Sequence, residues 1–304
     1  MDTQHHSEKT VVSVSRRTDI PAFFGGWFKA RLEEGFCSYR NPFGGQTFRV
    51  SLKRDDVLCF VFWSKNYKPF LPVLTELKHR GYPFYCQFTI TNYPKDLEHR
   101  VPPIEKILDT AREMADRFGP HRLQWRYDPI ILSSITPASF HLENFEYLLQ
   151  HLAPYTRRCY FSFVEMYQKV KRQFQVLIQD HQIEFHDPSK EEKENLLRQF
   201  AGLANPSRVR MLSCCNDSLV LPGLTEKGRC VDREIVEETV GQELPSLKLN
   251  GTRKECGCYK SRDIGEYETC LHDCRYCYAV SDHAAAVRKS RRVVPTHEFL
   301  VRPA

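Results

Sequence analysis

The sequence predicts an α/β fold in the form of a (β/α) barrel, complete or incomplete, with a cysteine-rich metal-cluster segment near its C-terminus. Short apolar runs alternate with helical patterns through the first 220 residues, and this alternation indicates a parallel sheet wrapped by helices. Five of the twelve cysteines lie between Cys256 and Cys277. No G-x-G-x-x-G motif follows the first apolar run, which argues against a doubly wound dinucleotide-binding sheet.

Six apolar runs rich in β-branched and aromatic residues fit buried parallel strands. They are Val11–Val14, Val57–Trp63, Phe84–Ile90, Leu123–Tyr127, Cys159–Val164 and Val209–Leu212. Helical patterns lie between most of them, at Ala22–Glu34, Ile104–Phe118, Ala138–His151, Tyr167–Gln179 and Ser189–Leu203. Pro103, Thr136–Pro137 and Pro188–Ser189 mark the starts of the second, third and fifth helices, because proline is tolerated where a helix begins.

The composition changes after this alternation. Residues 205–252 are loop-rich, with one helix expected near Arg233–Val240, and a final helix is expected at Ala284–Arg292. A further strand fits before Cys270. We therefore expect a barrel-like domain over residues 1–220. Residues 221–304 are expected to form a cysteine segment and a terminal helix that pack on the same barrel as one compact unit.

The overall composition narrows the class of protein. Hydrophobic residues make up 41% of the 304 residues, enough for a large core, which excludes a disordered chain. The net charge of +6 permits an anionic substrate or nucleic acid without requiring either. Met1–Thr10 lacks the apolar region of a signal peptide, and no run approaches the roughly 18 apolar residues of a membrane span. We therefore expect a cytoplasmic protein with no membrane partner.

The cysteines fall into groups with different expected roles. In a reducing compartment, many cysteines indicate metal ligands rather than disulfides. Cys37, Cys59, Cys86 and Cys159 lie in apolar surroundings and are expected to be small buried hydrophobic residues.

The spacing C-x3-C-x2-C at Cys270, Cys274 and Cys277 supplies three thiolates. A cubane iron–sulfur cluster needs one ligand for each of its four irons, so three thiolates leave one iron open for a substrate or cofactor. The alternative is a zinc site with a fourth ligand from elsewhere, such as Cys258 or His272.

A second metal site is predicted from the remaining cysteines. Its four ligands would be Cys214, Cys230, Cys256 and Cys258, and Cys215 could replace Cys214. Such a closed site could hold zinc or a second [4Fe-4S] cluster. The alternative is that Cys214, Cys215 and Cys230 are ordinary core residues.

Charged side chains follow most of the predicted strands. Because barrel chemistry takes place at the carboxyl ends of the strands, we expect these side chains to share one rim and to bind a cofactor or an anionic substrate. The candidates are Arg16, Arg17, Asp19, Lys65, Asn66, Arg126 and Asp128, with Glu165 nearby. The alternative is a set of salt bridges among these residues.

The segment Cys270–Cys277, with Tyr276 before its last cysteine, resembles the cluster loop of radical S-adenosylmethionine (SAM) enzymes. A wider resemblance to the uncharacterised bacterial family DUF1848 covers nearly the whole chain. It rests on Ser15–Pro21, Asn41-Pro42-Phe43, Phe62–Asn66, Trp125–Ile130, Cys256-Gly257-Cys258, Asp263-Ile264-Gly265 and Cys277-Tyr278-Ala279.

The resemblance to radical SAM enzymes implies a [4Fe-4S] cluster on the three cysteines, SAM at the open iron, and an electron donor such as ferredoxin or flavodoxin. In those enzymes the cysteine loop follows the first barrel strand, whereas here it lies near the C-terminus. A permuted barrel, in which the strand before the loop lies next to Val11–Val14, would reconcile the two.

The leading hypothesis is therefore a radical SAM enzyme that acts on an unknown substrate, with an anionic one in keeping with the cationic rim. The alternative is an iron–sulfur or zinc-bearing nucleic-acid-binding protein without redox turnover, in which Arg288, Lys289, Arg291 and Arg292 would contact phosphates. A zinc hydrolase is a weaker third hypothesis, because no H-E-x-x-H motif is present.

Overall fold

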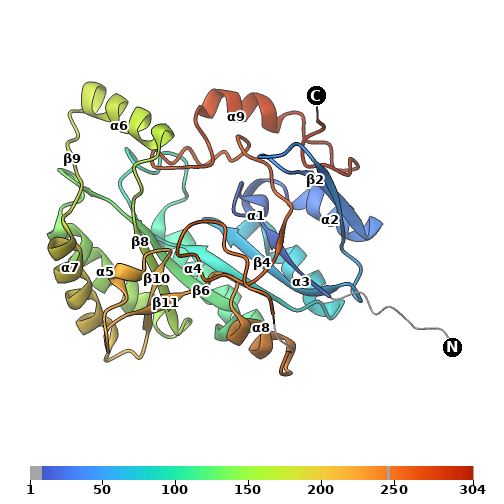
Figure 1. The fold of residues 1–304 in the computed structure, drawn as a ribbon, viewed down its shortest axis with the longest axis horizontal. Coiled ribbons are helices and arrows are strands. Elements are labelled where there is room, and N and C mark those ends of the chain that lie inside the picture. Colours follow the sequence, from blue (N-terminus) through green and yellow to red (C-terminus); the bar gives the residue numbers. More distant parts are fainter. Residues whose placement is uncertain (1–8, 245–246, 304) are drawn as a thin grey trace.

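The computed structural model describes residues 9–244 and 247–303, and its centre is an eight-stranded parallel sheet (Figure 1). The spatial order of the strands is β11-β10-β8-β6-β5-β4-β1-β12, and all seven neighbouring pairs are parallel. The strands are β1 (Thr10–Val14), β4 (Val57–Ser64), β5 (Phe84–Thr89), β6 (Leu123–Ile130), β8 (Arg158–Phe163), β10 (Arg210–Cys214), β11 (Glu226–Gly228) and β12 (Arg262–Asp263). All six predicted strands are confirmed.

The α/β class is confirmed, but a closed barrel is not shown. In the described part of the chain, β11 and β12 are the two edges of the sheet, and no pairing joins them. Of the N-terminal segment Met1–Thr10, in which the sequence predicts no signal peptide, the first eight residues lie outside the described ones. No helix among the described residues is long and apolar enough to cross a bilayer.

Helices pack against both faces of the sheet. They are α1 (Ile20–Phe23), α2 (Gly25–Glu34), α3 (Leu71–His79), α4 (Ile104–Phe118), α5 (Ala138–Leu152), α6 (Gln168–His181), α7 (Lys190–Ala204), α8 (Arg233–Val240) and α9 (His283–Ser290). Each predicted helix is present, although the first is interrupted at Phe24. The sequence did not predict α3, the antiparallel pair β2 (Phe36–Arg40) and β3 (Thr47–Ser51), or the short pair β7 (Leu132–Ser133) and β9 (Phe185–His186).

The two faces of the sheet have separate cores. The larger core contains Phe28, Phe62 and Phe145, from α2, β4 and α5. The smaller core joins Tyr85 and Tyr160 of the sheet to Ile235 and Val236 of α8. A helix from the C-terminal third of the chain therefore covers one face of the sheet. Cys37, Cys59, Cys86 and Cys159 are fully buried, as predicted.

The C-terminal segment returns to the first strand, as the sequence predicts for the strand before the cysteine loop. β12 pairs in parallel with β1, and the Asp263 carboxylate fixes this pairing. It accepts hydrogen bonds from the hydroxyls of Ser13 and Ser15, both at 2.7 Å, and from the backbone N–H of Arg16 at 2.9 Å. Figure 1 shows α9 and the C-terminus beside α2 and β2, at the opposite end of the sequence.

A close contact of Gly265 predicts that Gly265→Ala destabilises the pairing of β12 with β1. A Cβ at this position would stand 1.8 Å from the Ser15 hydroxyl oxygen, so Ser15 would have to leave Asp263. We expect the free energy of unfolding in urea to fall by about 1–3 kcal/mol. Gly26→Ala is the matched control: its Cβ would meet nothing within 4 Å, and alanine favours the helix by about 1 kcal/mol. Equal stability of the two variants would contradict the prediction.

His141 of α5 is buried in the neutral form. Its Nε2 lies 2.8 Å from the Ile131 carbonyl oxygen, which can only accept, so Nδ1 accepts from the Tyr127 hydroxyl, also at 2.8 Å. Burial lowers the pKa of His141 from 6.5 to about 4.

This lowered pKa predicts a loss of stability in acid. Below pH 6.5 the unfolded chain binds a proton at His141 that the folded chain accepts only near pH 4, so the loss develops between these values. It amounts to about 3 kcal/mol by pH 4. Urea unfolding at about pH 7 and about pH 4.5 should show a shallower loss in His141→Gln than in the wild type. Parallel losses in the two proteins would rule out His141 as the source.

Candidate functional site

Asp19 ties the cysteine loop to the carboxyl ends of two neighbouring strands. Its Oδ1 accepts from the backbone N–H of Ala22 and so caps α1. Its Oδ2 accepts from Lys65 N at 2.9 Å and from Ser64 Oγ at 3.0 Å, at the end of β4. The same oxygen lies 2.7 Å from Nε2 of His272, inside the cysteine loop. Asp19 therefore holds three segments together, and its side chain is 7% exposed.

A second buried carboxylate, Glu98, lies beneath the same loop. Its Oε1 accepts from Lys65 Nζ at 2.7 Å, from the Thr91 hydroxyl at 2.5 Å and from the Tyr276 hydroxyl. Burial would lower the pKa of Lys65, but Glu98 and the nearby Cys274 more than offset it and raise that pKa. The sequence did not predict a role for Glu98, because it lies in an irregular connection before α4 with no periodic pattern.

The three cysteines of the loop lie close together at this mouth. Cys277 N donates to the Cys274 carbonyl oxygen at 3.1 Å, which forms a tight turn, and Cys274 forms a backbone bridge with Glu98. Burial raises the pKa of all three thiols. A thiolate at Cys277 would raise the pKa of both Cys270 and Cys274 further, whereas the Lys65 ammonium acts to lower the pKa of Cys274.

The donor set of this loop fits a cluster with three protein ligands. Two buried polar atoms beside it, Thr18 Oγ1 and His272 Nδ1, have no partner among the described residues and could contact a bound group. Of the two fourth ligands considered for a zinc site, Cys258 interacts with Cys230 instead. His272 pairs with Asp19 through Nε2, which leaves its Nδ1 as the candidate fourth ligand.

The other five cysteines form a second group. Cys214 Sγ lies 3.6 Å from Cys230 Sγ and 3.8 Å from Cys215 Sγ. Hydrogen bonds with Cys215 and Cys258 lower the pKa of the Cys256 thiol, and those with Cys214 and Cys258 lower the pKa of Cys230. Cys214 therefore lies between Cys215 and Cys230, and Cys256 and Cys258 pack in the same cluster.

Two predicted rim arginines belong to this second group. Nη1 of Arg126 donates to Cys230 Sγ at 3.0 Å, and its Nη2 pairs with Asp128. Burial alone would lower the pKa of Arg126, but Cys230 and Asp128 raise it well above its usual value. The guanidinium of Arg16 stacks 4.9 Å over Trp63, and its pKa is also raised by Cys258 despite burial.

The predicted rim residues therefore divide into two sets, and two of them join neither. Asp19 and Lys65 lie with the loop cysteines, whereas Arg16, Arg126 and Asp128 lie with the five-cysteine group. Arg17 Nε is 3.9 Å from Asp263 of β12, whereas Asn66 stabilises a local turn by accepting from Lys68 N at 3.1 Å. Glu165 pairs with Arg253 at 3.0 Å.

Neither cysteine group is a preassembled metal site. Within residues 9–244 and 247–303, no three His, Cys, Asp or Glu side chains already stand in the geometry of a metal site. The ligand sets are therefore inferred from which thiols the fold brings together.

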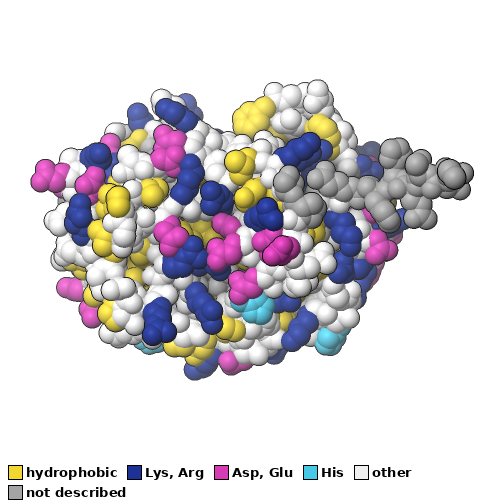
Figure 2. Space-filling model, turned by 60° about the horizontal axis from the view of Figure 1, so that its bottom comes forward, with side chains coloured by type: hydrophobic (Ala, Val, Ile, Leu, Met, Phe, Trp, Pro, Cys, Tyr) yellow, Lys and Arg dark blue, Asp and Glu magenta, His cyan; other side chains and the backbone are white. Residues whose placement is uncertain are grey.

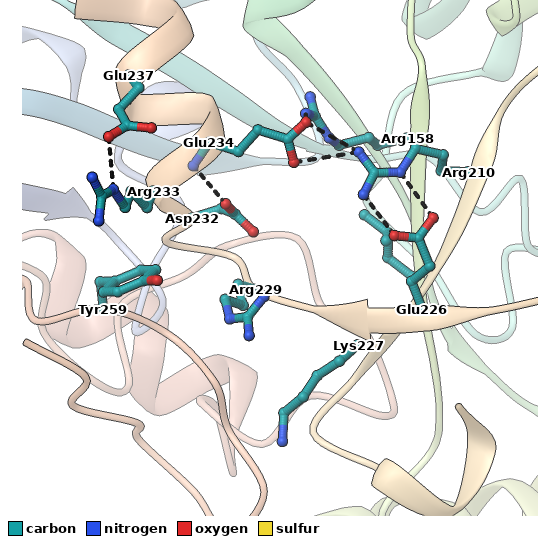
Figure 3. A pocket seen from close by; sticks show the side chains of 11 residues that line it. Arg158, Arg210, Glu226, Lys227, Arg229, Asp232, Arg233, Glu234, Glu237 and Tyr259 are labelled. Carbon is teal, nitrogen blue, oxygen red and sulfur yellow. Dashed lines mark hydrogen bonds and ion pairs between the residues drawn. The ribbon is translucent and has the colours of Figure 1, made fainter. Parts of the chain in front are cut away.

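Two cavities open on the surface. One, of about 650 Å³, is lined by Cys215, Glu165, Tyr167 and Arg253 and so reaches the five-cysteine group. The other, of about 390 Å³, lies at the opposite, amino ends of β8 and β10 (Figure 3). Several of its charges are paired within the cavity, with Arg210 bound to Glu226 at 2.6 Å and Arg158 to Glu234 at 2.8 Å. The face drawn in Figure 2 likewise intersperses basic and acidic side chains, without a basic stripe.

The buried pair of Lys65 and Glu98 predicts a large effect of Lys65→Met. The two side chains are 10% and 3% exposed, so the variant leaves a buried carboxylate without its cation. We expect a loss of about 3–5 kcal/mol in urea unfolding, part of which the double variant Lys65→Met/Glu98→Leu recovers. Lys68→Met removes a pair of similar length, 2.8 Å, from a lysine that is 66% exposed, and should cost less than about 1 kcal/mol. Similar losses in the two single variants would refute the assignment.

Among the comparisons with known proteins, only the match to a protein family is informative. No curated protein is significantly similar to the chain in sequence. Among solved structures, a D-hydantoinase has a TM-score of 0.31 and 10% identity, over 69% of this chain and 42% of that one. The D-hydantoinase of Bacillus sp. AR9 has a TM-score of 0.34 and 11% identity, over 73% of this chain and 46% of that one. This chain thus spans less than half of either hydantoinase, and TM-scores this low support no inference.

The comparison with protein families, by contrast, identifies the family of this chain. The model described as "Domain of unknown function (DUF1848)" matches residues 11–279, which include every strand-end residue and cysteine discussed above. The resemblance predicted from the sequence is confirmed, and the chain belongs to the DUF1848 family.

Proposed function

We propose that this protein is a radical SAM enzyme in which Cys270, Cys274 and Cys277 hold a [4Fe-4S] cluster. The observation that carries the proposal is a loop that brings three thiols to the carboxyl ends of parallel strands, where Asp19 and Glu98 hold it. That edge is where catalytic groups lie in barrel enzymes.

The strand order supports the same proposal. The cysteine loop follows β12, and β12 lies at the edge of the sheet next to β1. Counted across the sheet from this edge, β12 is the first strand. The loop therefore follows the first strand in space, as it does in radical SAM enzymes. We infer that the sheet is a partial barrel with a permuted strand order.

When bound, a cluster with one open iron would chelate SAM and supply the electron that cleaves it to a 5′-deoxyadenosyl radical. The residues of this chain orient the loop and exclude water. Lys65 and Tyr276 anchor it through Glu98, and His272 anchors it through Asp19. The Lys65 ammonium also lies near Cys274 and would offset the negative charge of its thiolate in the bound cluster. The electron would come from a donor such as ferredoxin or flavodoxin.

The nucleic-acid-binding alternative has less support. Of the four basic residues at α9, Lys289 binds Glu266 at 2.7 Å and Arg292 donates to the Arg302 carbonyl oxygen. These contacts hold the terminal helix in place. Binding to phosphates would have to be strongly salt-dependent, which separates the two hypotheses.

Anaerobic reconstitution tests the proposal. The full chain, supplied with iron and sulfide and then with dithionite and SAM, should release 5′-deoxyadenosine. Replacing any one loop cysteine, as in Cys274→Ala, should reduce this release at least about 100-fold, because the cluster loses a ligand. Cys37→Ala, at a fully buried thiol of the main core, is the matched control and should retain activity. Absence of 5′-deoxyadenosine, or an alternative fragment of SAM, from the wild type would contradict the proposal.

A further inference from the structure

We propose that the second cysteine group binds one zinc ion through Cys214, Cys230, Cys256 and Cys258, and that Cys215 is left as an accessible thiol beside it. This inference does not depend on SAM cleavage. It concerns a different set of thiols, and it selects zinc rather than a second [4Fe-4S] cluster.

The fold assembles the four thiols from three segments. Cys214 ends β10, and its pairing partner in β11 is Gly228, two residues before Cys230. A Cβ on Gly228 would stand 2.8 Å from the Ser213 carbonyl oxygen, so glycine allows this close approach. The Cys256-Gly257-Cys258 turn is fixed onto them, because Val231 N donates to Cys258 Sγ at 3.5 Å and Tyr259 N donates to the Val231 carbonyl oxygen.

The separation between two of the proposed ligands favours a single metal ion. A tetrahedral zinc site with Zn–S bonds of about 2.3 Å has neighbouring sulfurs about 3.8 Å apart. The Sγ atoms of Cys214 and Cys230 lie 3.6 Å apart. In a cubane each thiolate binds a different iron, so its sulfurs stand farther apart. As the side chains stand, these thiols hydrogen-bond one another. On binding, each would release its proton and turn towards the common ion.

The surrounding charges match a site with four thiolates. Zinc with four thiolates carries a net charge of −2, which must be offset where it is buried. Arg126 Nη1 and Nη2 lie 3.0 Å from Cys230 Sγ and 3.7 Å from Cys214 Sγ. Arg16 is a second cation near Cys258 and Cys230, and Asp263 also lies near it. Two arginines therefore lie beside the thiols, and Asp128 and Asp263 offset part of their charge.

The choice of Cys214 over Cys215 follows from their surroundings. Cys214 is 5% exposed and lies within reach of Arg126, which can compensate a thiolate. Cys215 is partly exposed and lines the 650 Å³ cavity with Arg253. Its backbone is left-handed, with φ of 57°, and it lies just beyond the end of the strand that carries Cys214.

Metal analysis of a variant that lacks the loop thiols tests the inference. The full-length triple variant Cys270→Ala/Cys274→Ala/Cys277→Ala removes the proposed SAM cluster, so any metal that remains belongs elsewhere. We expect about one zinc per chain and no acid-labile sulfide. After the zinc is removed with a chelator, Co²⁺ should bind and show the visible absorption bands of a tetrahedral thiolate site.

Single substitutions on this background identify the ligands. Cys214→Ser and Cys258→Ser should each lower bound zinc to less than about a fifth, whereas the neighbouring Cys215→Ser should retain it. Circular dichroism shows whether each variant folds. The Co²⁺ spectrum of the triple variant tests the site even if a further substitution prevents folding. Four irons with sulfide in the triple variant, or neither zinc nor a Co²⁺ band, would overturn the zinc site. If Cys214→Ser kept its zinc and Cys215→Ser lost it, the ligand assignment would be wrong. None of these results depends on SAM cleavage, so the two proposals fail independently.

Discussion

The hydrogen bonds that Asp263 accepts from the start of the chain are the constraint on which the rest of the structure depends. Three donors, the hydroxyls of Ser13 and Ser15 and the N–H of Arg16, meet one buried carboxylate and fix β12 beside β1. The two partners are about 250 residues apart in sequence, so this contact closes most of the chain into one unit. It also fixes the position of the chain after β12, so the cysteine loop that follows lies over the ends of β1, β4 and β5.

A buried charge accompanies each cysteine group at that edge. Lys65 stands beneath the loop thiols, and Arg126 and Arg16 stand beside the five-cysteine group. Each cation has few polar partners other than thiols and one or two carboxylates. Lys65 is paired with Glu98 and Arg126 with Asp128, and thiolates formed on metal binding would add a further negative charge beside each cation. Metal binding is the ordinary way for buried thiols to become anions at neutral pH.

Much of this fold was predictable because its elements are strongly periodic. Helix α4 was predicted from Ile104 to Phe118, as observed, because its apolar residues lie on one face and Pro103 precedes it. Helix α3 was missed, although Pro72 in its first turn is a signal for a helix start. The role of Glu98 could not be predicted from sequence, because it depends on which distant segment folds against it. The sequence also could not show whether the sheet closes, because pairing between the two edge strands, β11 and β12, would leave no local pattern in the sequence.

Electron paramagnetic resonance of the anaerobically reconstituted and reduced protein, recorded with and without SAM, tests the central claim most directly. If Cys270, Cys274 and Cys277 hold a cluster with an open iron, SAM should change the spectrum of the reduced cluster, and Cys274→Ala should lose that signal. A cluster signal that is identical with and without SAM would mean that no iron is open to it, and it would contradict the proposed function.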